Sequence, residues 1–104
     1  MNGEFTDRVA LITGAGSGIG RAIALAYGQA GACVVAADIG EASVEATVDA
    51  IRAAGGCATA VVADVTDADS VAAMVDRATA IGPIGAACNC AGIAGAAART
   101  GEYP

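Results

Sequence analysis

The chain has 104 residues, a length that fits one small domain with a modest core. It carries 11 acidic residues against five arginines, without lysine or histidine, and its formal net charge is −6. This balance excludes a basic surface for a phosphate backbone, and 3% aromatic residues are too few for a base-stacking platform, so nucleic acid is not an expected partner.

No apolar run reaches the length of a membrane span, and the N-terminus has neither the basic nor the apolar region of a signal peptide. The sequence therefore predicts a cytoplasmic protein without a membrane partner. In that compartment Cys33, Cys57, Cys88 and Cys90 are expected to be reduced thiols.

Apolar runs alternate with helix-period segments along the chain, which is typical of βαβ units around a parallel sheet. Gly31 follows the first helical segment, where a left-handed residue commonly ends a helix, and Thr66 is the expected N-cap of the third. Residues after Gly92 are expected to form a loop. In chain order we expect a strand at 9–12, a helix at 19–30, a strand at 33–37, a helix at 41–54, a strand at 57–63, a helix from Thr66 to Gly82-Pro83, and a strand at 85–90.

These elements make a single α/β domain, 1–104, with neither an internal repeat nor a linker. Right-handed crossovers predict a parallel sheet of four strands in the order 3-2-1-4 with three crossover helices, which is a partial Rossmann-type doubly wound fold. The first two helices should cover one face of the sheet. The third should cover the other face, because the third crossover reverses direction.

A glycine-rich turn separates the first strand from the first helix, with the sequence Thr13-Gly14-Ala15-Gly16-Ser17-Gly18-Ile19-Gly20. Glycines at such a place let the backbone approach a pyrophosphate, whose charge meets N–H groups at the helix N-terminus. The common G-x-G-x-x-G spacing does not fit, and a P-loop requires a lysine. The pattern that fits is T-G-x-x-x-G-x-G, and a turn without any ligand is the alternative. The residues predicted to bind a cofactor here are Gly14, Ser17, Gly18, Ile19 and Gly20.

This pattern resembles the short-chain dehydrogenase/reductase family, and the resemblance extends from Arg8 to Pro104. It implies an oxidoreductase that binds a nicotinamide dinucleotide on a Rossmann-type fold. In full-length members of the family, the activity is hydride transfer between the cofactor and an alcohol or ketone.

Asp38 ends the second strand, 18 residues after Gly20. A carboxylate at that place can accept hydrogen bonds from the adenosine ribose hydroxyls and would repel a phosphate on the 2′ oxygen. Ser17, Ile39 and Gly40 occupy the positions where NADP-preferring relatives often carry a cation. The sequence thus predicts NAD as the cofactor, and a capping or turn aspartate is the alternative reading of Asp38.

The resemblance also assigns roles after the third strand. It implies that Asp64 and Val65 contact the adenine ring, while local capping of the third helix is an alternative that could hold at the same time.

Residues 89–92, Asn-Cys-Ala-Gly, resemble the family's Asn-Asn-Ala-Gly motif at the end of the fourth strand. The resemblance implies that Asn89 stabilises the central sheet and lies by the cofactor ribose, with Ala91 and Gly92 also in the cofactor site. Cys90 replaces the second asparagine, which weakens the polar contact of that amide. Cys88 and Cys90 share one face of a strand, but a closed metal site needs four ligands, so no metal is expected.

The family's chemistry uses a serine, a tyrosine and a lysine four residues after the tyrosine. The chain contains no lysine, and its tyrosines are Tyr27 and Tyr103, so we expect no catalytic residue in it. The chain is interpreted as the NAD-binding N-terminal half of such an oxidoreductase. The alternative is a non-catalytic nucleotide-binding or interaction module. Self-association is expected through the sheet face under the third helix and the edge of the fourth strand.

Overall fold

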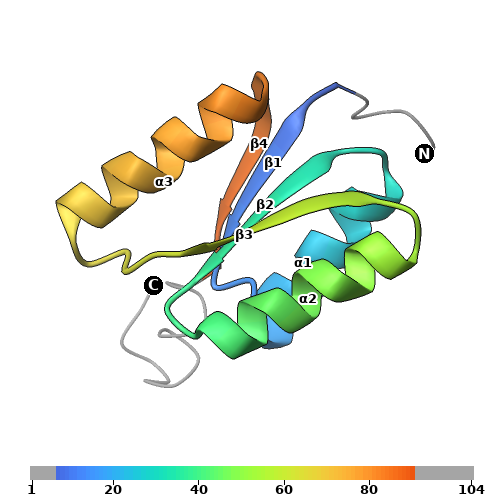
Figure 1. Ribbon diagram of the computed structural model, residues 1–104, viewed down its shortest axis with the longest axis horizontal. Helices are drawn as coiled ribbons and strands as arrows, with labels where there is room; N and C mark the ends of the chain where they lie inside the picture. The colour runs from blue at the N-terminus through green and yellow to red at the C-terminus, as the bar shows by residue number, and fades with distance from the viewer. Residues whose placement is uncertain (1–6, 91–104) are drawn as a thin grey trace, which may run out of the picture.

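The computed structural model describes residues 7–90, in which strands and helices alternate without exception (Figure 1). The bounds of six of the seven elements lie within one residue of those predicted. In chain order the elements are β1 (Val9–Thr13), α1 (Gly18–Gln29), β2 (Cys33–Asp38), α2 (Glu41–Ala53), β3 (Cys57–Val62), α3 (Ala68–Ile81) and β4 (Ile84–Asn89).

The four strands form one parallel sheet in the order β3-β2-β1-β4, which confirms the predicted topology. The ladder between β2 and β3 begins at the pair Cys33–Cys57 and ends at the pair Asp38–Val62. All four strands run in one direction, so their carboxyl ends meet at a single edge of the sheet.

The helices cover the two faces as predicted: α1 and α2 lie on one side and α3 on the other (Figure 1). Alternate residues of β1, β2 and β3 contribute to the two cores, because side chains in a strand point to opposite faces. Under α1 and α2 the largest contributors are Ile12, Val34, Val44, Val48 and Ile51. Under α3 the core contains Val9, Leu11, Val35, Ala37, Ala63, Met74 and Ala78.

The N-cap of α3 lies one residue later than predicted. Asp67, not Thr66, is the N-cap, and its carboxylate accepts a hydrogen bond from the backbone N–H of Asp69 at 3.0 Å. The Thr66 hydroxyl instead donates a hydrogen bond to the carboxylate of Asp64. Gly31 has φ 97° directly after the C-cap of α1, so the predicted left-handed residue is confirmed.

The expectation of reduced thiols is wrong for two of the four cysteines. Cys33 and Cys57 are joined by a disulfide, with their Cα atoms 4.6 Å apart. They are directly opposite in adjacent strands, and this register brings the sulfurs together. Cys88 and Cys90 are free thiols.

Among residues 7–90, none of the helices combines the length and the apolar character that a membrane crossing requires. The predicted loop after Gly92, together with Ala91, Gly92 and Tyr103, lies outside the described residues.

Candidate functional site

The candidate site lies at the carboxyl edge of the sheet, where the turns leave β1, β2 and β3 and where β4 ends (Figure 1). Every predicted site residue within the described range belongs to this edge. Crevices outside the carboxyl ends of parallel strands are the usual place for ligands in open α/β sheets.

The turn between β1 and α1 depends on two glycines in different ways. A Cβ atom built on Gly20 would overlap the carbonyl oxygen of Gly14, so only glycine lets α1 approach the turn this closely. Gly18 has φ 59°, in the left-handed region that favours glycine, and its missing Cβ faces open space with no atom within 4 Å. The backbone is therefore tightly packed at Gly20, whereas the space beside Gly18 is open.

The first turn of α1 begins at Gly18, beside this open space. Ser17 occupies the N-cap position, yet its side chain makes no capping hydrogen bond, and the first turn carries no acidic residue. The dipole of a helix adds positive potential at this end, so the arrangement suits an anion.

Asp38 fastens the turn to the end of β2. One carboxylate oxygen, Oδ2, accepts a hydrogen bond from the N–H of Gly16 at 2.8 Å, and Oδ1 accepts one from the N–H of Gly40 at 3.2 Å. A Cβ atom on Gly16 would lie 2.7 Å from Oδ2. Asp38 is thus a turn aspartate, as the alternative reading had it. Each of its oxygens still has a lone pair for a further donor.

Sequence reasoning missed Thr47, which holds the same turn from the side of α2. Its hydroxyl is fully buried and donates to the carbonyl of Ala15 at 2.8 Å. The N–H of Ala15 in turn donates to the carbonyl of Ala37 at 3.1 Å. The sequence did offer one signal for a buried threonine, because Thr47 stands next to Val48 on the apolar stripe of the second predicted helix.

A small pocket of about 110 Å³ opens between the ends of β1, β2 and β3. Its apolar walls include Ile39, whose side chain is 69% exposed, and Val65, which is 38% exposed. Ile39 was not among the predicted site residues, although a bulky apolar residue directly after a strand-end acid was a usable signal. The lining residues are Gly14, Asp38, Ile39, Ala63, Asp64 and Val65.

Asp64 organises the turn that leads from β3 to α3. Its Oδ1 accepts hydrogen bonds from the Thr66 hydroxyl at 2.6 Å and from the Thr66 N–H at 2.9 Å. These two bonds hold the pKa of Asp64 below its usual value, so the side chain is ionised at neutral pH. With Asp38 it adds a second carboxylate to the pocket wall.

Asn89 joins the end of β4 to the end of the neighbouring strand β1. Its Oδ1 accepts a hydrogen bond from the hydroxyl of Thr13 at 2.8 Å, which supports the implied role in stabilising the sheet. Thr13 is the first residue of the predicted turn pattern, although it was not among the predicted binding residues, and it is buried at the end of β1. Cys90 is buried directly after β4, and this burial, with a smaller effect of Cys88, raises the pKa of the Cys90 thiol.

Comparison with known proteins identifies relatives of both the sequence and the fold. The family model described as short chain dehydrogenase matches residues 8–102. Cyclohexanol dehydrogenase from Acinetobacter sp. (strain SE19) is 42% identical over 103 residues, which are 98% of this chain and 41% of that protein.

Two crystal structures extend the comparison to three dimensions. The hydroxysteroid dehydrogenase from Escherichia coli has a TM-score of 0.78 and 37% identity, covering 82% of this chain and 37% of that one. A short chain dehydrogenase/reductase from Burkholderia phymatum, in complex with NAD, has a TM-score of 0.69 and 45% identity, covering 72% of this chain and 27% of that one. The chain spans less than half the length of these relatives.

Proposed function

Because this chain belongs to the short-chain dehydrogenase family, we propose that it binds NAD(H) at the carboxyl edge of its sheet and prefers it to NADP(H). The observation that carries the proposal is the turn between β1 and α1. Hydrogen bonds with Asp38 and Thr47 hold this turn in place, and the space beside Gly18 is open.

The residues present fit the parts of the dinucleotide one by one. The N–H groups at Gly18, Ile19 and Gly20 suit the pyrophosphate, since they begin α1 and Ser17 does not cap them. Asp38 has free lone pairs for the hydroxyls of the adenosine ribose.

The remaining predicted residues complete the proposed site. The pocket between Ile39 and Asp64-Val65 has apolar walls suited to the face of the adenine ring. At the end of β4, Asn89 would lie toward the second ribose. Ala91 and Gly92 are assigned to the site on the family resemblance alone.

The preference for NAD rests on charge. A 2′-phosphate would bring negative charge against the carboxylate of Asp38, and like charges at hydrogen-bond distance repel. The side chains next to Asp38, those of Ile39 and Ser43, offer no cation to offset this repulsion. The NAD bound in the Burkholderia phymatum relative supports the same choice.

The reaction we propose for a protein of the family's full length is hydride transfer between NAD and an alcohol, and cyclohexanol is the first substrate to test. Bound NAD would supply the hydride acceptor, while the 104 residues position it. Tyr27 does not match the family's catalytic tyrosine, because Gly31 and not a lysine stands four residues after it. We therefore expect the chain on its own to bind the cofactor without turnover.

Calorimetric titration with NAD and NADP tests the proposal. We expect tighter binding of NAD, and the substitution Asp38→Asn should narrow the preference, because it removes the charge but keeps an acceptor oxygen for Gly16. Asp76→Asn removes the same charge from the exposed face of α3 and should leave the preference unchanged. Equal or tighter binding of NADP by the unmodified chain would overturn the cofactor assignment. NAD-dependent oxidation of cyclohexanol by the chain alone would instead contradict the expectation of binding without turnover.

A further inference from the structure

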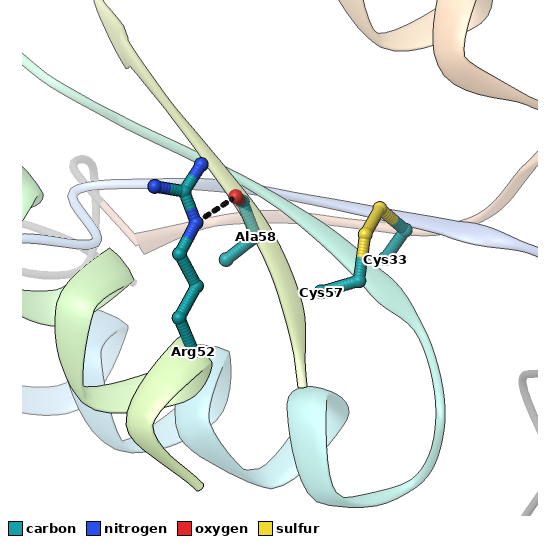
Figure 2. Close-up of a disulfide and its surroundings, with 4 residues drawn as sticks. All are labelled: Cys33, Arg52, Cys57 and Ala58. Atoms are coloured by element: carbon teal, nitrogen blue, oxygen red, sulfur yellow. Dashed lines mark hydrogen bonds between the residues drawn. A yellow bond between two sulfur atoms is a disulfide. The ribbon is translucent and has the colours of Figure 1, made fainter. Parts of the chain in front are cut away.

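The disulfide between Cys33 and Cys57 lies at the amino edge of the sheet, opposite the proposed dinucleotide site. The two cysteines are the first residues of β2 and β3 and the first pair of the ladder between these strands (Figure 2). The bond therefore joins the beginnings of two adjacent parallel strands.

The disulfide-bonded residues lie at the surface of the sheet's amino edge. Cys57 is exposed and Cys33 is half-buried. Both line a pocket of about 440 Å³, open at the surface, whose other walls include Arg8, Ile81 and Pro83. A small thiol or disulfide can therefore reach the bond without unfolding of the sheet, and access is one of the conditions for thiol–disulfide exchange.

The bond matters most for β3, because this strand is the edge of the sheet and pairs only with β2 among the described strands. Near the same end of β3, the Nε of Arg52 on α2 donates a hydrogen bond to the carbonyl of Ala58 at 3.0 Å (Figure 2). This hydrogen bond also holds β3 in place. The disulfide closes a segment with a sequence separation of 24, which contains the whole of α2. Cross-linking such a segment restricts the unfolded chain and stabilises the folded one.

We propose that Cys33 and Cys57 form a reversible thiol–disulfide modification site that fastens β3 to the sheet. In the oxidising direction, the thiolate of exposed Cys57 attacks a low-molecular-weight disulfide such as oxidised glutathione. The attack forms a mixed disulfide and releases one thiolate. The thiolate of Cys33 then attacks the Cys57 sulfur and releases the second. Two protein thiols are oxidised, two small thiols are produced, and the two protons pass to solvent or to the released thiolates.

The effect is transmitted along β3 to the other edge of the sheet. The ladder that begins at Cys33–Cys57 ends at Asp38–Val62, and the N–H of Ala63 donates to the carbonyl of Asp38 at 3.0 Å. Asp64 and Val65 follow and line the small pocket. Opening the disulfide should therefore loosen that pocket and weaken NAD binding, an extension that rests on the proposed function.

The test equilibrates the chain with mixtures of reduced and oxidised glutathione, blocks free thiols by alkylation, and maps tryptic peptides. Cleavage at the arginines places Cys33 in residues 22–52, Cys57 in 53–77, and both Cys88 and Cys90 in 78–99, so each pairing gives a distinct product. Amide hydrogen exchange of residues 57–63 is measured on the oxidised and reduced forms, together with the affinity for NAD. Cys57→Ser removes the site, and Cys88→Ser removes a free thiol as the control.

We expect a reversible cross-link between 22–52 and 53–77, exchange in β3 about tenfold or more faster after reduction, and weaker NAD binding by the reduced chain. Cys57→Ser should behave as the reduced form under all conditions, and Cys88→Ser as the unmodified chain. Absence of that cross-link at every glutathione ratio, or equal exchange in both forms, would overturn the modification site. If the site responds but neither form binds NAD, the proposed function fails and the site stands. Equal NAD affinity in both forms would overturn the transmission to the pocket.

Discussion

Gly18 and Gly20 are two residues apart, yet an added methyl group meets different surroundings at each. At Gly20 it would overlap the backbone carbonyl of Gly14, which cannot move without displacing the turn from α1. At Gly18 it would enter open space, and the cost comes only from φ 59°, where an L residue loses roughly 1–2 kcal/mol. One glycine is therefore required by packing, and the other leaves room for a ligand.

These surroundings predict that Gly20→Ala mainly lowers stability, whereas Gly18→Ala mainly lowers the affinity for NAD. Gly20→Ala should lower the free energy of unfolding by at least about 2 kcal/mol, as overpacking against a fixed backbone does. Gly18→Ala should remain folded and lose NAD affinity, because the new methyl group fills the space where the pyrophosphate is proposed to lie. Urea unfolding followed by circular dichroism, with calorimetry on each variant, separates the two effects. A Gly18→Ala chain that binds NAD as tightly as the unmodified chain would argue against a ligand in front of the turn.

At the scale of the elements, the sequence predicted what depends on local pattern and missed what depends on distant partners. The stripe of Val44, Val48 and Ile51 on α2 follows from helical spacing, and all three are buried. Thr47 lies in the same buried surface, but its hydrogen-bond acceptor, the carbonyl of Ala15, is 32 residues away.

The cysteines and the cap of α3 were predicted wrongly for other reasons. The starts of β2 and β3 were predicted at Cys33 and Cys57, which is enough to place the two residues in register. The expectation of reduced thiols came instead from the presumed compartment. At α3 both Thr66 and Asp67 are residue types that cap helices, and the structure shows Asp67 as the cap while Thr66 donates two hydrogen bonds to Asp64.

Thr47→Val tests whether α2 positions the glycine turn. The valine keeps the shape of the side chain but leaves the carbonyl of Ala15 buried without this donor, which should cost about 1–3 kcal/mol of unfolding free energy. Thr79→Val is the matched control, because the hydroxyl of Thr79 bonds the carbonyl of Asp76 on the exposed surface of α3. That control should stay within about 0.5 kcal/mol. Equal losses of unfolding free energy for the two variants would show that the buried Thr47 hydrogen bond contributes no more to stability than the exposed one.

At the scale of the whole molecule, the two faces of the sheet are covered unequally within residues 7–90. Two helices pack on one face and α3 alone on the other (Figure 1). A pocket of about 320 Å³ opens on the α3 side, lined by Leu11, Thr13, Val65, Val71, Met74, Ala87, Cys88 and Asn89. Ile81 and Ile84, at the end of α3 and the start of β4, are 41% and 36% exposed. Apolar surface of this kind favours association.

We therefore expect the chain to self-associate, with a sedimentation coefficient that rises with protein concentration. Ala87→Lys places a charge on exposed β4 beside the apolar pocket and should suppress the association. Ala46→Lys introduces the same charge on the exposed surface of α2 and should not. Sedimentation as a monomer at all concentrations would contradict the expectation.

The most direct test of the dinucleotide site is a titration of the isotope-labelled chain with NAD, followed through its backbone amide resonances. We predict that the amides of Gly16, Gly18, Ile39 and Val65 shift together along one binding curve, since all of them surround the carboxyl edge of the sheet. The amides at the opposite edge, near Cys57, should stay unchanged. The absence of shifts in the glycine turn at saturating NAD, or shifts confined to the amino edge, would contradict the account.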